Sequence, residues 1–245
     1  MEETCRHALK VGLPAIAFTE HADFVKAFPN QHPVDMDGYL KCVERCRSRF
    51  PGLRILAGVE LGEPHWFPAE SAAALSSARL QRVLGSVHCL RRGETVVDMS
   101  QGVLTPADAP ALLREHLRET LALLESGSPF QILAHVDYPK RYWPHQQLAY
   151  REEDFEEECR AVLRAAAARD AVLEVNTTRG IEPVRGLCPG PVVLGWWREE
   201  GGEAVSFGSD SHEPAMIAAG FETAAGFVEA AGFKPSADPT GFWRR

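Results

Sequence analysis

The sequence predicts one α/β domain built on a parallel sheet, and three observations predict this fold class. Short apolar runs alternate with amphipathic or alanine-rich stretches of helical length through most of the chain. Consecutive parallel strands need a crossover, and the stretches between the apolar runs are long enough to be crossover helices. Most of the apolar runs end on His, Glu or Asp. A barrel with its site at the carboxyl ends of the strands has this pattern.

Length and composition fit a single globular domain over residues 1–245. The chain is 45% hydrophobic and 24% charged, and a barrel of this length need not be divided. Its net charge of −8 argues against a nucleic acid or a membrane surface as partner, because neither is attracted by a negative mean field. We therefore expect a small molecule as the partner.

Cysteine usage and the chain start bear on location. The six cysteines form no Cys-x-x-Cys pair, which favours reduced thiols over disulfides or a structural zinc knuckle. No apolar run approaches the roughly 18 residues of a membrane span, and the first residues lack the regions of a signal peptide. The predicted location is the cytoplasm.

The first half of the chain supplies three predicted strands. Gly12 and Pro14 end the first helix, and Pro51-Gly52 closes the second, which Asp37 is predicted to cap. Residues 24–36 and 89–104 lack a clear period and are predicted to be loops. The strands are predicted at 15–19, 54–59 and 82–87, and the helices at 4–11, 37–50 and 69–80.

The second half supplies three more strands. Pro106 and Asp108 open a long helix that Gly127 ends, and an acidic stretch opens the next helix at the end of the macrodipole that favours negative charge. Residues 234–245 are predicted to be an irregular tail packed by Phe242 and Trp243. The strands are predicted at 130–134, 171–175 and 204–207, and the helices at 105–126, 152–169, 192–200, 214–219 and 222–231.

The strand ends predict a metal site. Asp210 and His212 follow the last strand, and a carboxylate with an imidazole suits Zn²⁺, Mn²⁺ or Fe²⁺. Alone, this segment fits equally well a turn capped by Asp210 or Ser211, with His212 on the surface. Five of six strands end on His, Glu or Asp, however, and this joint pattern favours metal binding. The strand-end residues are His21, Glu60, His88, His135, Asn176, Asp210 and His212.

Together these motifs resemble those of the PHP (polymerase and histidinol phosphatase) superfamily, in its histidinol-phosphatase branch. The similarity covers essentially the whole chain in the family's order. It implies a distorted barrel of seven strand-helix units, a (β/α)7 fold, with up to three divalent metals at its mouth. The matching motifs are Thr19-Glu-His-Ala-Asp23, Gly58-Val-Glu60, Gly85-Ser-Val-His88, Leu133-Ala-His135, Glu174-Val-Asn-Thr177 and Gly208-Ser-Asp-Ser-His212.

The resemblance also implies roles for the strand-end residues. Glu60 resembles the carboxylate that bridges two metals, and His88 with His135 completes the shell of one of them, so one metal site is whole here. Asp210 resembles a ligand of the partner metal. His21 and His212 resemble two ligands of a third metal. On this basis Glu60, His88, His135 and Asp210 are the predicted catalytic residues.

One family motif has no counterpart in this chain. The family begins with a strand carrying His-x-His, and none precedes the helix at Met1, which leaves six strand-helix units. Either Met1 is an internal start of a longer protein, which is our expectation, or the barrel is shortened. A missing barrel strand would expose two sheet edges. We expect a chain extended upstream to contain the His-x-His and to gain metal content and thermal stability.

The predicted activity is hydrolysis of L-histidinol phosphate to histidinol and phosphate. Clustered divalent metals activate water at neutral pH and neutralise phosphoryl charge. Arg141 and Lys140 are predicted to hold phosphate oxygens, with Arg179 as a second choice, although each could be a solvated surface cation. Glu20 and Asp23 are expected to orient His21.

Other assignments stay open at this stage. A related metal-dependent phosphoesterase could act on nucleotides or other small phosphate esters, and a degenerate barrel could bind metal without turnover. Glu63, His65 and Trp66 could shape the pocket after Glu60. The remaining histidines are predicted to lie on the surface, namely His32, His116 and His145.

Overall fold

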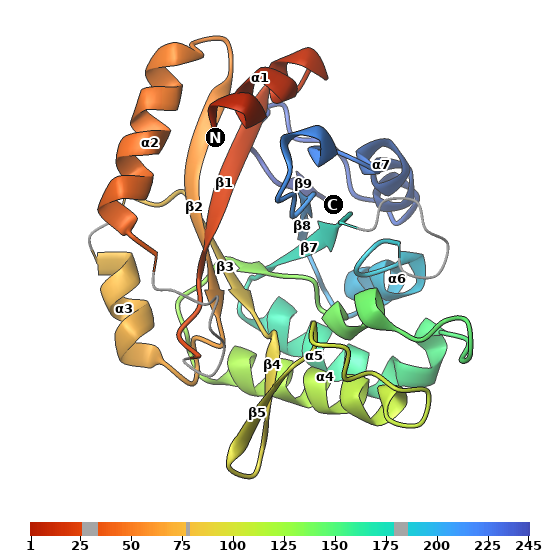
Figure 1. Ribbon diagram of the computed structural model, residues 1–245. Helices are drawn as coiled ribbons and strands as arrows, with labels where there is room; N and C mark the ends of the chain where they lie inside the picture. Colours follow the sequence, from red (N-terminus) through yellow and green to blue (C-terminus); the bar gives the residue numbers. More distant parts are fainter. Residues whose placement is uncertain (26–33, 77–78, 179–185) are drawn as a thin grey trace.

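A curled sheet of seven strands forms the centre of the computed structural model, which describes residues 1–25, 34–76, 79–178 and 186–245 (Figure 1). The strand order is β1-β2-β3-β6-β7-β8-β9, and every neighbouring pair from β1 to β8 is parallel. The strands are β1 Ala15–Ala22, β2 Arg54–Gly62, β3 Arg82–Ser86, β6 Ile132–Leu133, β7 Val172–Asn176, β8 Ala204–Gly208 and β9 Trp243–Arg244.

The sheet confirms the predicted α/β class, with six parallel strands at the predicted places. It is a half-barrel rather than a closed barrel, because no described strand pairs with the outer edge of β1 and joins it to β8. The sheet is therefore open between β1 and β8 in the described part of the chain. The N-terminal strand that the resemblance implies stays a prediction.

The sequence pattern does not predict a hairpin and one edge strand that the structure contains, because these segments carry weak local signals. Cys89–Arg92 (β4) and Thr95–Asp98 (β5) form an antiparallel hairpin within the predicted loop, and Gly93 supplies its turn at φ +62°. The predicted irregular tail contributes β9, which pairs antiparallel with β8 through Trp243 and Val205. This short pairing covers only the first residues of the β8 edge.

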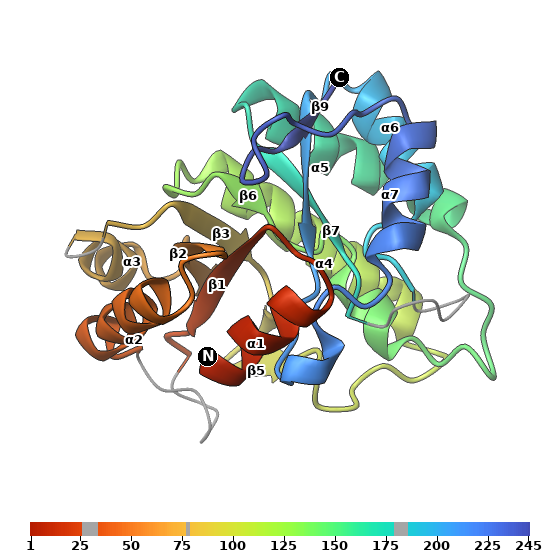
Figure 2. The ribbon, with the colours of Figure 1, turned by 90° about the horizontal axis from the view of Figure 1, so that it is seen from above.

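Helices cover the outer face of the sheet (Figure 2). Helices α2 and α3 lie beside β1 and β2, α4 and α5 lie under the middle strands, and α6 and α7 lie beside β8. No helix in the described ranges is long and apolar enough to cross a membrane. The helices are α1 Glu2–Lys10, α2 Met36–Arg49, α3 Pro68–Ser76, α4 Ala109–Glu125, α5 Glu156–Ala168, α6 Pro191–Glu199 and α7 Phe221–Ala230, with 3₁₀ turns η1 Tyr138–Tyr142, η2 Glu152–Phe155 and η3 Pro214–Met216.

Several helix starts differ from the prediction. Asp35, not Asp37, caps α2, because its carboxylate accepts from the backbone N–H of Gly38 at 3.1 Å. The acidic stretch from Glu152 forms a 3₁₀ turn before α5 begins at Glu156. Residues 214–219, predicted as a helix, contain only the short turn η3.

The alternation of side chains along the strands divides the core from the site. In β7, Leu173 and Val175 belong to the large apolar cluster that includes side chains of α4, α5 and α6. Glu174 and Asn176 point to the opposite face, inside the curl. The outer face therefore carries most of the hydrophobic packing, and the inner face near the carboxyl ends of the strands carries the polar residues.

Candidate metal centre

A buried group of three side chains lies at the carboxyl end of the middle strands. Glu60 lies near the end of β2, and His88 and His135 each follow a strand by two residues. The Nε2 atoms of His135 and His88 lie 3.0 and 3.3 Å from Glu60 Oε1. One ligand atom from each residue lies within 4.8 Å of the other two, which is a suitable separation for binding one cation.

Burial and neighbouring charges shift the pKa values of these three side chains in ways that favour binding of a cation. Burial alone would raise the pKa of Glu60, but hydrogen bonds from His135 and His88 hold it well below its usual value. Burial lowers the pKa of His135, helped by the charge of Arg141, so its imidazole is neutral and able to act as a ligand. Burial opposes the charged form of His88, yet hydrogen bonds to Asp23 and Glu60 raise its pKa well above the usual value. The carboxylates around His88 thus favour a positive charge at this point.

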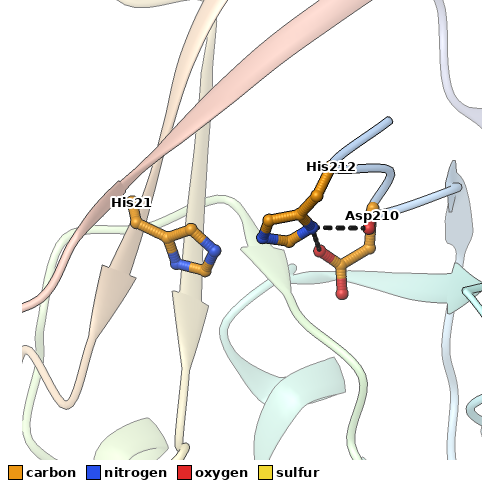
Figure 3. Close-up of side chains that lie close together, drawn as sticks. All are labelled: His21, Asp210 and His212. Carbon is orange, nitrogen blue, oxygen red and sulfur yellow. Dashed lines mark hydrogen bonds and ion pairs between the residues drawn. The ribbon is translucent and has the colours of Figure 1, made fainter. Parts of the chain in front are cut away.

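A second group lies across the opening of the half-barrel (Figure 3). His21 comes from β1, whereas Asp210 and His212 follow β8, so the group joins the two sides of the gap. The imidazole rings of His21 and His212 are 5.6 Å apart. Their ligand atoms and a carboxylate oxygen of Asp210 all lie within 4.8 Å of one another. The structure thus places Asp210 beside both histidines, whereas the resemblance assigns it to a different metal.

Glu60 connects the two groups. Its Oε1 faces His88 and His135, and its Oε2 lies 3.7 Å from His21 Nδ1. The parallel register of β1 and β2 sets His21 directly opposite Glu60. A carboxylate with one oxygen toward each group has the arrangement that a bridging ligand needs.

Acidic side chains surround the histidines. Asp23 Oδ2 lies 3.4 Å from His21 Nδ1, and Asp23 Oδ1 lies 3.7 Å from His88 Nδ1. Glu20 is exposed and, within the described ranges, accepts only from the backbone N–H of His21, at 3.3 Å. Asp23 is therefore the better placed of the two to orient a ligand imidazole.

The loop after Glu60 makes hydrogen bonds that hold the main chain at His88 and connect the loop to α4. Glu63 is buried, accepts from the backbone N–H groups of His88 and Cys89, and has its pKa raised by burial to about 7. His65 Nε2 and Trp66 Nε1 both lie 2.6 Å from Glu119 Oε1 on α4. These two contacts tie the loop to α4.

The predicted phosphate-binding cations are placed differently from one another. Lys140 is buried, and its ammonium donates to Glu152 at 3.2 Å and to the Leu187 carbonyl at 2.6 Å. These bonds occupy the Lys140 ammonium within the fold, and phosphate binding by Lys140 stays a prediction. Arg141 Nη1 lies 2.7 Å from Asp210 Oδ2, and its Nε and Nη2 are buried with no hydrogen-bond partner in the described part of the chain. Arg179 lies outside the described residues.

Two further predictions meet the structure here. His116, predicted on the surface, is 1% exposed on α4, and its Nε2 lies 3.2 Å from the Val136 carbonyl. The sequence pattern of α4 could have indicated this, because His116 shares a face with Leu112 and Leu113. Glu174 and Asn176 line the inner face beside both groups. The sequence pattern indicates Asn176 as a strand-end residue but predicts no role for Glu174.

A cavity of about 720 Å³ opens beside the two groups, between β1 and β8. His21, Glu60, Asp210 and His212 line its polar end, and Glu2 and Thr4 of α1 also line it. Apolar side chains also line the cavity, beside polar and charged ones such as Glu2, Arg45 and Arg82; the apolar ones include Phe18, Leu84, Ile132, Phe207 and Ile217.

The residues fit divalent cations. The donors are imidazole nitrogens and carboxylate oxygens, which suit zinc, manganese or iron. Among the described residues, the buried Nδ1 atom of His21, which faces Glu60 Oε2 at 3.7 Å, has no hydrogen-bond partner. Buried polar atoms of this kind are normally satisfied, and a ligand is one way to satisfy them.

Comparison with known families identifies the chain. The model of the PHP domain matches residues 1–178. The chain belongs to the PHP-domain family. This PHP protein is 28% identical over 207 residues to the histidinol-phosphatase of Lactococcus lactis, covering 84% of this chain and 75% of that protein. It is 27% identical over 223 residues to a probable histidinol-phosphatase of Clostridium acetobutylicum, covering 90% and 83% of the two chains.

Solved structures extend the similarity to the fold. The crystal structure of histidinol phosphate phosphatase from Lactococcus lactis, complexed with zinc, L-histidinol and phosphate, matches with a TM-score of 0.83. That match covers 95% of the PHP protein and 87% of the other chain at 25% identity. A putative histidinol phosphatase from Listeria monocytogenes shares the fold with a TM-score of 0.72 at 18% identity, covering 91% and 92%.

Proposed function

We propose that this PHP protein is a metal-dependent phosphomonoesterase that hydrolyses L-histidinol phosphate to L-histidinol and phosphate. The observation that carries the proposal is the pair of ligand groups joined by Glu60, the second of which lines a cavity together with Glu60. Similarity to a histidinol phosphate phosphatase that binds zinc, L-histidinol and phosphate supports the substrate. The corresponding cellular role is a step of histidine biosynthesis in the cytoplasm.

The two groups would hold the metals. Glu60, His88 and His135 would bind one cation, and His21, Asp210 and His212 would bind another, with zinc, manganese or iron as the candidates. Bound metals supply an activated water and neutralise phosphoryl charge. The chain's own task is to hold ionised Glu60 and neutral His135 in position and to exclude bulk water around them, which their burial achieves.

The cavity suits a small ester better than a polymer. One part of it is lined by the second ligand group and Glu60, and its apolar side chains can accept an imidazole ring. A net charge of −8 opposes binding of a nucleic acid. We keep Arg141 as the proposed phosphate contact, because its guanidinium contacts Asp210, which lines the cavity, and two of its nitrogens lack hydrogen-bond partners among the described residues.

The test is a phosphatase assay with added Zn²⁺, Mn²⁺ or Fe²⁺. The wild type should release phosphate from L-histidinol phosphate, and His88→Ala and His135→Ala should lose this activity by at least about 100-fold, as expected when a metal ligand is removed. His7→Ala on α1 is the matched control and should retain it. Equal activity in the three variants and the wild type would refute the assignment.

Other substrates provide the alternatives. Faster turnover of a nucleotide monophosphate than of histidinol phosphate would favour a phosphoesterase of different specificity. A protein that binds one metal or none, and is inert toward histidinol phosphate, nucleotides and an aryl phosphate, would be a degenerate barrel without turnover.

A further inference from the structure

Glu174 is a buried carboxylate beside both ligand groups that belongs to neither. It lies in β7, is 5% exposed, and lines the cavity on the inner face of the sheet. A carboxylate in such a position is costly to bury unless hydrogen bonds compensate for the lost hydration. Its hydrogen bonds therefore indicate what it does.

In the described part of the chain, two donors reach Glu174, and both bind the same carboxylate oxygen. The backbone N–H of His135 donates to Glu174 Oε2 at 2.9 Å, and Asn176 Nδ2 donates to it at 3.2 Å. The first bond fixes the main chain at the residue whose imidazole faces Glu60. The second fixes the amide of Asn176.

The amide of Asn176 carries the connection to the second group. Its Nδ2 also lies 3.4 Å from Asp210 Oδ2, the oxygen that Arg141 Nη1 holds at 2.7 Å. With Oδ2 held in this way, the other oxygen, Oδ1, is the one that faces His212, 3.9 Å from its Nδ1. The contacts thus select which Asp210 oxygen is presented to the histidines.

Gly208 sets the position of the Glu174 carboxylate. In the neighbouring strand β8, Gly208 is paired with Asn176, two residues beyond Glu174, and a Cβ atom on Gly208 would lie 2.1 Å from Glu174 Oε1. The carboxylate therefore occupies space that only glycine leaves free. This close approach limits the conformations open to the Glu174 side chain.

We propose that Glu174 is a positioning residue. It orients His135 directly and orients Asp210 through Asn176, so that it fixes the relative positions of the two ligand groups of the proposed phosphatase. This inference rests on the proposed function for its metals and deepens it. Because both donors share Oε2, an amide whose oxygen takes this place preserves both hydrogen bonds. The proposal thus requires the hydrogen bonds of Glu174 and not its negative charge.

The experiment compares Glu174→Ala, Glu174→Gln and Val175→Ala in the full chain. Zinc affinity is measured by competition with a chromogenic chelator, and thermal unfolding is followed by circular dichroism. Glu174→Ala should weaken zinc binding about 10- to 100-fold, the range for residues that orient metal ligands. Glu174→Gln should stay within about threefold of the wild type, since the same orienting bonds remain.

Val175→Ala is the matched control. Val175 lies in the same strand and is fully buried, but it packs on the helical side. It should lower the unfolding temperature without changing zinc affinity. A general loss of stability is thereby separated from a loss of positioning.

Two results would overturn the proposal. One is a folded Glu174→Ala variant with wild-type zinc affinity; the other is a Glu174→Gln variant as weak as Glu174→Ala, which would show that charge matters. If Glu174→Ala does not fold, Asn176→Ala takes its place and should weaken zinc binding, while unchanged affinity contradicts the proposal. A wild-type protein that binds zinc but does not hydrolyse histidinol phosphate would refute the proposed function and leave the positioning role of Glu174 standing, because the comparison of zinc affinities does not depend on the substrate.

Discussion

The pKa values of buried carboxylates in this protein depend on a competition between burial and neighbouring charges. Glu60 stays ionised in a buried position because His135 and His88 donate to it. Glu174 shows the opposite balance: burial, followed by the charges of Glu60 and Asp210, raises its pKa to about 8. Two neighbouring carboxylates thus differ because only one is surrounded by imidazoles.

Replacing Arg141 separates two roles for its guanidinium. Arg141→Lys shortens the side chain and removes the planar fork, so both its contact with Asp210 and any contact with phosphate should weaken. If Arg141 binds phosphate, we expect KM for histidinol phosphate to rise about tenfold or more while zinc affinity changes little. The measurement is steady-state kinetics beside zinc competition. Reduced zinc affinity with unchanged KM would assign Arg141 to Asp210 alone.

His116 should make stability depend on pH. Burial lowers its pKa from 6.5 to about 3, so between these values the unfolded chain binds a proton that the folded chain excludes. Stability from this group is therefore lost as pH falls below about 6.5, by about 2 kcal/mol at pH 5.

The comparison uses His116→Gln, whose amide can still donate to the Val136 carbonyl. Urea unfolding at pH 7 and pH 5 should show a smaller loss in His116→Gln than in the wild type. The metal ligands are the same in both proteins, so their own titration cancels in the difference. An identical pH dependence of the two proteins would contradict the assignment.

At the scale of elements, close approach between strands depends on glycine. A Cβ on Gly208 would meet the far end of a flexible side chain, Glu174, whereas a Cβ on Gly58 would meet the Arg82 carbonyl at 2.8 Å and Thr19 Cγ2 at 2.9 Å. A carboxylate can move aside, but a backbone in the sheet cannot do so cheaply.

The two glycine variants should therefore differ. Gly208→Ala should displace Glu174 and weaken zinc binding about tenfold or more with a small change in unfolding temperature. Gly58→Ala should cost about 1–3 kcal/mol in stability, the usual range for overpacking. Chelator competition and urea unfolding of both variants test this contrast. The expectation fails if Gly208→Ala keeps wild-type zinc affinity.

At the scale of the whole molecule, the second ligand group spans the open side of the half-barrel. His21 comes from the β1 edge, and Asp210 and His212 come from beyond β8, so a cation bound there would join segments that share no strand pairing. Binding to the folded state alone stabilises a protein by about 4 kcal/mol at a thousand times the dissociation constant.

Removal of the metal should therefore destabilise the open side of the half-barrel, at β1, before the rest of the sheet. Dialysis against a chelator should lower the unfolding temperature and speed hydrogen exchange of β1 amides, and added zinc should reverse both changes. Amides of β7, which is paired on both sides, serve as the internal control. Uniform exchange in the two strands, with and without zinc, would contradict a metal that closes the gap.

The local sequence pattern was sufficient to predict the parallel strands and the polar residues at their ends. Apolar runs placed all six parallel strands, and the residues following them include both ligand groups, because parallel strands bring their carboxyl ends to one edge. The same approach failed for the β4–β5 hairpin and for His116. In those places the helical face or the partner strand, not the local composition, decides the environment.

The sequence by itself determined the α/β class, the order of strands and the side chains that gather at their ends, since periodicity and parallel connections are local properties. Only the tertiary structure decided that Lys140 bonds to Leu187, that Trp243 pairs with Val205, and that Asp210 offers one oxygen to Arg141 and the other to His212. These contacts join residues that are distant in the chain. Their geometry depends on packing of the whole sheet and its helices, which no local pattern contains.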